Sequence, residues 1–418
     1  MPVPAAVLAD PAPQPAATPP ASKAPRFAEF VALIASLMAL GALGIDSMLP
    51  ALPVIGRDLH VQHENSLQWI VSIYFMGLGF GQLIFGILSD WLGRKRVLLA
   101  GIALYVLLGV LAGLSQNFAV LLILRLVQGI CAATSNVVSR SIIRDLYSGR
   151  TMAKVTSLSV MVFLLAPILA PSFGQVILSF APWRAIFFSL SLIGALTGLW
   201  AWLRMPETLP EDRRHRPDPG HLRRVGWFIA TEPSSLFYTL AVMVLTGSLL
   251  AYVSLMPQIF TDVFHRPSLM ALVFAGCAGT MGVASLVNAS LVERLGMKRI
   301  SHTTLTAFVV FTLLHTVWAL LGLETILSFL ILQALTMGAM NLSNSNFNAV
   351  SMEKMGHVAG TAASLQGVVT TVGGGLLASL IGQGWTGQVW ILPFGALLCG
   401  VVSMGLIVMA EKGRMYRN

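Results

Sequence analysis

The stretch Gly86-Ile-Leu-Ser-Asp90-Trp-Leu-Gly-Arg94-Lys-Arg-Val-Leu98 places four charges within seven residues of a chain that is only 10% charged. An apolar run of about twenty residues lies on each side of it, which is the length that crosses a membrane as a helix. A loop this short therefore joins two membrane-spanning helices. Its three cations mark the cytoplasmic side, because Lys and Arg are enriched in cytoplasmic loops.

The composition indicates a membrane protein along the whole chain. Its 418 residues are 56% hydrophobic, with a mean hydropathy of +0.79. A water-soluble globule needs more surface charge than this chain carries. The net charge of +9 would fit a nucleic-acid partner. Because basic residues of a membrane protein collect in its inner loops, we interpret the charge as topology and expect no such partner.

Windows of about twenty apolar residues predict twelve helices. They lie near 28–50, 67–88, 97–115, 118–139, 155–180, 185–203, 234–256, 270–291, 301–322, 326–346, 358–381 and 389–410. We expect an all-α polytopic membrane protein of two pseudo-symmetric six-helix bundles. The predicted parts are a disordered cytoplasmic tail (1–27), a first bundle (28–203), a cytoplasmic linker (204–233), a second bundle (234–410) and a cytoplasmic tail (411–418).

The basic residues predict the orientation. With the N-terminus inside, 22 of the 26 Lys and Arg residues fall in the tail, the even-numbered loops and the C-terminus. Three fall outside, and Arg125 falls within a helix. This distribution puts both termini in the cytoplasm of a multi-pass inner-membrane protein.

The two bundles are predicted to be repeats. A shift of 203 residues aligns the opening stretch with Ala289-Ser-Leu-Val-Glu293-Arg-Leu-Gly296-Met-Lys298-Arg299-Ile300. The match preserves a leucine, an acid, a glycine and two cations, and it falls between the second and third helices of each set. Two like-oriented halves are typical of a transporter with a central site.

The three cysteines lie singly in apolar segments, without the spacing of a metal site. Cys131, Cys277 and Cys399 are therefore expected to be buried thiols, with neither a disulfide nor a bound metal.

Four stretches resemble a known family. The first is similar to the loop signature of the major facilitator superfamily, G-x-L-[SA]-D-x-x-G-R-[KR]-x-x-L. Asp46-Ser-Met-Leu-Pro-Ala-Leu-Pro53 resembles a D-x-Y-L-P-A-L-P end of helix 1, with Met48 replacing the tyrosine, and Arg125-Leu-Val-Gln128-Gly129 resembles R-x-x-Q-G of helix 4. Ala166-Pro167-Ile-Leu-Ala-Pro171-Ser-Phe-Gly174 resembles the antiporter signature A-P-x-x-A-P-x-x-G of helix 5.

Together with Trp183-Arg-Ala-Ile-Phe187 and Pro206-Glu-Thr-Leu209, these stretches resemble the Bcr/CflA group of drug:proton antiporters, which includes bicyclomycin- and chloramphenicol-type exporters. The resemblance covers residues 28 to about 210 well. The second half follows the family in its general pattern more than in exact motif residues.

Apart from residues near the helix ends, two formal charges lie inside the predicted spans, Asp46 and Arg125. Charges at membrane depth are costly and indicate function. At 1.5 Å per residue both lie roughly 6 to 11 Å below the outer surface. Burial favours the protonated form of a carboxyl group and a nearby Arg favours the ionised form, so motion that changes either would load or release a proton. The alternatives are an ionised outer carboxylate for Asp46 and a donor to backbone carbonyls for Arg125.

The opening stretch predicts a cytoplasmic gate formed by Gly86, Asp90, Gly93, Arg94 and Arg96. We expect Asp90 to bind the helix N-terminus near residues 358–361, where unpaired N–H groups carry partial positive charge. Gly93 permits the tight turn. A pure topology signal would account for the cations but not for the acid and the glycines.

On helix 5, Pro167, Pro171 and Gly174 supply bends and a small surface for close packing. The resemblance implies that this stretch limits proton leak, and a plain kink is the alternative.

A substrate cavity between the halves would be lined by polar and aromatic side chains. The candidates are Trp69, Tyr74, Gln128, Asn136, Tyr238, Tyr252, Gln333, Asn341, Asn344 and Gln366. Taken singly, such residues more often serve packing or an interhelical hydrogen bond than substrate contact, and His302 and His315 are expected to be packing residues.

These observations predict a transporter rather than an enzyme: an exporter of lipophilic drug-like compounds, driven by the proton gradient with no other cofactor, and active as a monomer. The chain lacks a G-x-x-x-x-G-K-[ST] phosphate loop, which disfavours ATP-driven transport. An exporter of a native metabolite such as a siderophore, amino acid or sugar is the first alternative. A membrane enzyme would need a clustered nucleophile, His and acid, which the sequence does not show, and a non-transporting receptor would not need Asp46.

Overall fold

The computed structural model describes residues 26–416 except 148–150, 153–154, 156–157, 160–165, 215, 217, 356–357 and 415. These residues separate into two compact units, which divide between Asp218 and Pro219. We call them the N-half and the C-half and describe each by itself.

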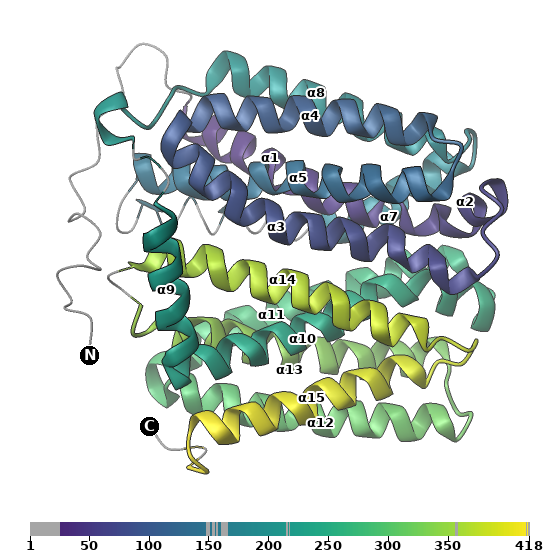
Figure 1. Cartoon of the computed structure of the whole chain (residues 1–418). Helices are drawn as coiled ribbons and strands as arrows, with labels where there is room; N and C mark the ends of the chain where they lie inside the picture. The colour runs from purple at the N-terminus through teal and green to yellow at the C-terminus, as the bar shows by residue number, and fades with distance from the viewer. Residues whose placement is uncertain are drawn as a thin grey trace. The chain divides into compact units, whose positions relative to one another are not determined.

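The N-half consists of helices joined by short turns (Figure 1). Its elements are α1 (Phe27–Asp46), η2 (Leu49–Ala51), α2 (Leu52–Asp58), η3 (Glu64–Gln68), α3 (Trp69–Leu92), α4 (Arg94–Leu114), α5 (Phe118–Leu146), α7 (Ala166–Leu178), α8 (Arg184–Arg204) and η4 (Glu211–Arg213). Helices predominate because a helix satisfies its own backbone hydrogen bonds where no water is present.

The C-half repeats this plan after one additional helix. Its elements are α9 (Pro219–Thr231), α10 (Pro233–Gln258), the π-turn η5 (Ile259–Val263), η6 (Pro267–Leu269), α11 (Met270–Leu295), α12 (Met297–Leu320), α13 (Ile326–Met352), α14 (Ala359–Gln383) and α15 (Ile391–Ala410). Among the described residues, 11 helices are long and apolar enough to cross a membrane, and α7 is a shorter apolar helix between two of them. The predicted all-α architecture is confirmed.

Two predicted segments need a fuller account than a shifted helix end. Within the predicted span 155–180 the structure describes α7 only from Ala166, and the side chain of Pro167 lies outside the described residues. Within the predicted linker 204–233, residues from Pro219 fold as α9, which buries Val225 and Ile229 against Met355 and Ala362. The linker thus contains a helix that packs on the C-half.

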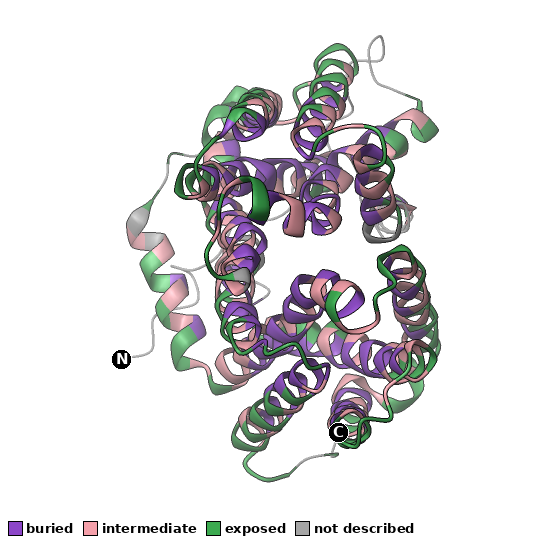
Figure 2. Ribbon diagram, turned by 90° about the vertical axis from the view of Figure 1, so that its right-hand side faces the viewer, coloured by how far each residue is buried: buried purple, intermediate pink, exposed green. Residues whose placement is uncertain are grey.

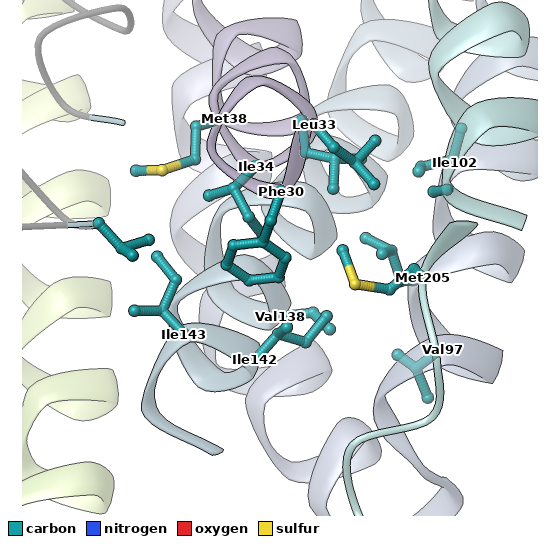
Figure 3. Close-up of a cluster of buried hydrophobic side chains, with 14 of the residues drawn as sticks. Phe30, Leu33, Ile34, Met38, Val97, Ile102, Val138, Ile142, Ile143 and Met205 are labelled. Atoms are coloured by element: carbon teal, nitrogen blue, oxygen red, sulfur yellow. The ribbon is translucent and has the colours of Figure 1, made fainter. Parts of the chain in front are cut away.

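The core of the N-half is a cluster of aliphatic and aromatic side chains (Figure 3). Phe30, Leu33, Ile34 and Met38 of α1 meet side chains from the other helices. These partners are Val97 and Ile102 of α4, Val138, Ile142 and Ile143 of α5, and Met205 just after α8. The cluster fixes α1 against α4 and α5, and so fixes the depth of Asp46 at its end.

The outer faces of the helices are apolar as well. On α4, Leu104, Leu107, Leu111 and Leu114 are between 42 and 60% exposed, at the three- and four-residue spacing of one helix face. Leu192, Leu196, Leu199 and Leu203 form the same stripe on α8. Buried residues lie where helices meet within each half and exposed residues lie on outer faces (Figure 2). Water would disfavour these stripes, and lipid chains would cover them.

Candidate functional site

Arg125 is fully buried and joins three helices of the N-half. Its Nη2 donates to the carbonyl of Gly44 on α1 at 2.9 Å, and its Nε donates to the carbonyl of Ile70 on α3 at 3.5 Å. Its Nη1 donates to Oε1 of Gln128 on α5 at 3.0 Å. The guanidinium carbon also lies 4.2 Å from the centre of the Tyr74 ring. A planar group with several fixed donors suits this arrangement, because one side chain can serve acceptors in different directions.

Asp46 ends α1, two residues after the carbonyl that Arg125 binds. The residue is 5% exposed. Among the described residues, its carboxyl group has neither a hydrogen bond nor an ion pair. Arg125 and Asp46 therefore share one end of α1, as the sequence predicts, but they form no ion pair. The donors of Arg125 serve backbone carbonyls and Gln128, which is the alternative role that the sequence left open.

The antiporter signature lies against the end of α1. Gly174 of α7 touches the backbone next to Asp46 so closely that a Cβ atom on it would lie 2.0 Å from the carbonyl oxygen of Ser47. Pro171 lies inside the same helix. The close packing predicted for this stretch is therefore found, and its partner is the segment that holds the buried acid.

Replacing Gly174 by Ala is expected to destabilise the protein by about 1 to 3 kcal/mol, because α7 or α1 must move to admit the methyl group. Thermal unfolding in detergent measures the loss, and the decay of a pH gradient across proteoliposomes measures proton leak. Gly282→Ala is the matched control, since a Cβ atom there meets nothing within 4 Å. Equal melting temperatures for the two variants would contradict the contact.

The opening stretch forms a one-residue turn. Gly93 alone separates α3 from α4, and Gly296 alone separates α11 from α12. Their φ values are +99° and +79°, with ψ of 149° and 152°, a region that only glycine occupies freely. The two copies of the motif thus have the same backbone conformation, which supports the predicted repeat.

Arg94 organises the inner end of the N-half. It is 3% exposed and forms an ion pair with Asp90 one turn earlier. Its Nε donates to Oδ2 of Asp145 at 3.0 Å and its Nη1 donates to Oγ of Ser89 at 2.8 Å. In the second repeat the corresponding residue is Met297, so this network belongs to the N-half alone. The predicted contact of Asp90 with residues 358–361 joins the two halves and stays a prediction.

Glu207 completes the turn, and the sequence did not predict this role. Its carboxylate accepts from the backbone N–H groups of Arg94 at 2.8 Å and Lys95 at 3.2 Å, which are the first N–H groups of α4. It also accepts from the backbone of Thr208 and Leu209. The Pro206-Glu-Thr-Leu209 stretch held the signal, because an acid is favourable at a helix N-terminus.

Replacing Gly93 by Ala is expected to cost more stability than the same change at Gly296. Both substitutions strain the backbone by about 1 to 3 kcal/mol. At Gly93 the new Cβ atom would also lie 2.6 Å from Oε2 of Glu207, which occupies the start of α4. Melting temperatures of G93A and G296A test this, and equal losses would show that the Glu207 contact contributes nothing.

Tyr238 belongs to a polar chain inside the C-half. The backbone N–H of Tyr416 donates to Nδ1 of His302 at 3.1 Å, so Nε2 carries the ring proton of a neutral His302 and donates to the Tyr238 hydroxyl at 3.0 Å. That hydroxyl donates to Oε1 of Glu411 at 2.9 Å, and Lys298 lies 2.8 Å from the same oxygen.

Burial alone raises the pKa of Glu411, but the hydrogen bonds from Lys298 and Tyr238 outweigh it and hold the pKa below its usual value. His302, expected to be a packing residue, is therefore a hydrogen-bonding one. The second expected packing residue, His315, is fully buried, packs edge-on against Phe329 and lies 3.5 Å from Oε2 of Glu324.

The other cavity candidates have varied surroundings. Tyr74 and Gln128 contact Arg125. Gln366 donates to Ser235 at 3.0 Å, and Asn341 donates to Ser285 at 2.8 Å. Tyr252 is buried against Phe274, Gln333 is buried, and three are partly buried: Trp69, Asn136 and Asn344. Their contact with substrate stays a prediction. Cys131, Cys277 and Cys399 are buried and free.

The family model of the Major Facilitator Superfamily matches residues 33–378 of this sequence. The chain belongs to this superfamily. Relatives include the uncharacterized MFS-type transporter YdgK of Bacillus subtilis, which is 32% identical over 88% of this chain and 90% of the relative. The bicyclomycin resistance protein homolog of Haemophilus influenzae is 30% identical over 84% of this chain and 88% of the relative. Multidrug resistance protein MdtL of Escherichia coli is 28% identical over 91% and 95%.

A solved structure supports the fold. The human organic anion transporter MFSD10 matches with a TM-score of 0.63 at 19% identity, and the match covers 92% of this chain and 99% of that one. The resemblance to the Bcr/CflA group is confirmed by the relatives named for bicyclomycin resistance and multidrug resistance. The protein is a multi-pass membrane transporter of the major facilitator superfamily.

Proposed function

We propose that this major facilitator protein exports lipophilic, drug-like compounds in exchange for protons across a bacterial inner membrane. Relatives named for bicyclomycin resistance and multidrug resistance, similar over most of the chain, support the drug-export part. The strong excess of cations on one side of the predicted topology supports cytoplasmic termini.

The observation that carries proton coupling is the buried Asp46 carboxyl group, which has no partner among the described residues. A buried carboxyl group without a fixed partner can exchange a proton without breaking an ion pair. It also lies beside the contact between Ser47 and Gly174, so motion of α7 against α1 would change its surroundings. Proton and cargo can be exchanged only if each of them shifts the same two-state equilibrium.

Arg125 and the motif loop have supporting roles in this proposal. Arg125 holds α1, α3 and α5 together beside Asp46. The gate residues Gly86, Asp90, Gly93, Arg94 and Arg96 hold the inner side closed while the transporter faces outward. The predicted contact of Asp90 with the helix N-terminus near residues 358–361 requires Asp90 to leave its ion pair with Arg94. The protein works as a monomer and uses the proton gradient as its energy source.

The test is efflux from proteoliposomes with an imposed pH gradient, using neutral and cationic lipophilic compounds. We expect accumulation against a concentration gradient that collapses when a protonophore is added. Aromatic and amide candidates such as Tyr252 and Gln333 suit neutral or weakly polar cargo. Transport at the same rate with and without the protonophore would overturn proton coupling. Transport of polar metabolites but of no lipophilic compound would overturn the proposed cargo.

A further inference from the structure

Two cavities lie next to each other on the outside of the N-half. One, of about 520 Å³, lies among the start of α4, the end of α8 and the segment after α8. The other, of about 440 Å³, lies between the outer faces of α4 and α8. Leu99 and Trp202 line both of them, so the two are neighbours, and we treat them as the two ends of one site. Each volume is within the range of small-molecule binding sites.

The first end is charged, with an excess of cations. Lys95, Arg96 and Arg214 line it together with Glu207 and Glu211. Glu207 is used by the backbone N–H groups at the start of α4, and Glu211 pairs with Arg214 at 3.2 Å. Among the described residues, the side chains of Lys95 and Arg96 have no hydrogen-bond or ion-pair partner. Two cations are thus available to an anion.

The second end is lined by apolar residues of α4 and α8. Between larger residues such as Ile102 and Leu199, the short side chains of Ala103 on α4 and Ala195 on α8 leave space unfilled. The exposed stripes of Leu107 and Leu192 continue beside them on the same two helices. A flexible hydrocarbon chain fits a groove of this kind, and it is already the solvent of this surface.

The two ends lie at a membrane boundary. The charged end is formed by the loop whose cations mark the cytoplasmic side, and the apolar end runs along two membrane-spanning helices. Trp202, 57% exposed, stands between them, as tryptophans do at the level of lipid headgroups. A ligand must therefore be anionic at the membrane surface and apolar below it.

We propose that this site binds an anionic glycerophospholipid of the inner leaflet, with its phosphate beside Lys95 and Arg96 and one acyl chain between α4 and α8. The lipid would tie the motif loop to the segment that carries Glu207. The site is separate from Asp46 and Arg125, and its occupation does not depend on which compound the protein exports.

Lipid binding by purified protein in detergent tests the proposal, by native mass spectrometry and thermal unfolding. The probes are phosphatidylglycerol, phosphatidylcholine with the same chains, and glycerol 3-phosphate. We expect phosphatidylglycerol to bind most tightly and to raise the melting temperature. Each cation near an anionic lipid changes affinity by about fivefold. The K95Q/R96Q variant is therefore expected to lose about 25-fold affinity for phosphatidylglycerol and little for phosphatidylcholine.

Two further variants make the result decisive. Arg299→Gln removes the same charge at the equivalent position of the second repeat and is expected to change the affinity less than twofold. Ala103→Phe fills the apolar end and is expected to weaken both lipids, whereas Leu313→Phe on the exposed side of α12 is its control. Equal losses in R299Q and K95Q/R96Q would overturn the proposal. Protection by glycerol 3-phosphate equal to that by the lipid would also overturn it, because it would indicate a simple anion pocket.

Discussion

Replacing Asp46 by Asn is expected to abolish efflux driven by a pH gradient while leaving the protein folded. The amide has nearly the same shape but cannot carry the exchanged proton. Because the carboxyl group has no partner among the described residues, its replacement leaves no donor unpaired there. We therefore expect the free energy of unfolding to change by less than about 1 kcal/mol. Gradient-driven efflux in proteoliposomes measures the loss of coupling, and thermal unfolding in detergent measures the change in stability.

The control for this variant is Asp58→Asn in the same half. Asp58 is 44% exposed and pairs with Arg184 beyond the end of α1, so its replacement is expected to leave coupled efflux largely intact. Cargo binding to D46N, measured by quenching of tryptophan fluorescence, is expected to persist but to lose its dependence on pH. Efflux by D46N that still follows the pH gradient would exclude Asp46 as the coupling acid.

Replacing Arg125 by Lys is expected to destabilise the protein by about 2 to 4 kcal/mol, although the charge is kept. A single ammonium group cannot reach the carbonyls of Gly44 and Ile70 and also Gln128, and it loses the stacking on Tyr74. Buried acceptors would then lack donors at the point where α1, α3 and α5 meet. The expected result is a lower melting temperature together with strongly reduced efflux.

Arg57→Lys is the matched control, because Arg57 is exposed at the outer end of the same half. Its melting temperature is expected to stay at the wild-type value. The same experiment separates the two roles of Arg125. If R125K is less stable but still exports, the role of Arg125 is structural. If R125K has normal stability but no efflux, Arg125 acts in coupling, which would contradict the three-helix bridge as its main role.

The single-residue turn at Gly93 shows how far sequence reasoning extends. Four charges between two apolar runs predict a short cytoplasmic loop, and the repeat 203 residues later predicts its second copy. The structure confirms the short turn and its second copy, since Gly93 and Gly296 adopt the same backbone conformation, and the cytoplasmic side stays a prediction. It adds that only the first copy is held by Arg94, Asp145 and Glu207, because residues distant in sequence must meet before such a network exists.

The buried charges show what sequence reasoning leaves undecided. The cost of a charge at membrane depth made Asp46 and Arg125 candidates from the sequence alone. Which groups they contact is decided by packing: Arg125 turns to the carbonyl of Gly44 rather than to Asp46, and Gly174 approaches Ser47. Hydropathy and motif spacing contain no information on these contacts, because rotamers and helix approach depend on neighbours from all parts of the half.

The sequence by itself determined that the chain lies in a lipid bilayer, the order of its membrane-spanning helices and the internal repeat. These follow from apolar length, charge distribution and the rule that a helix in lipid must satisfy its own backbone. Only the tertiary structure decided which acid caps α4, how α9 packs, and where small residues leave a groove between α4 and α8. Such features arise where side chains from separate helices meet, and the free energy of that packing is shared among residues far apart in the chain.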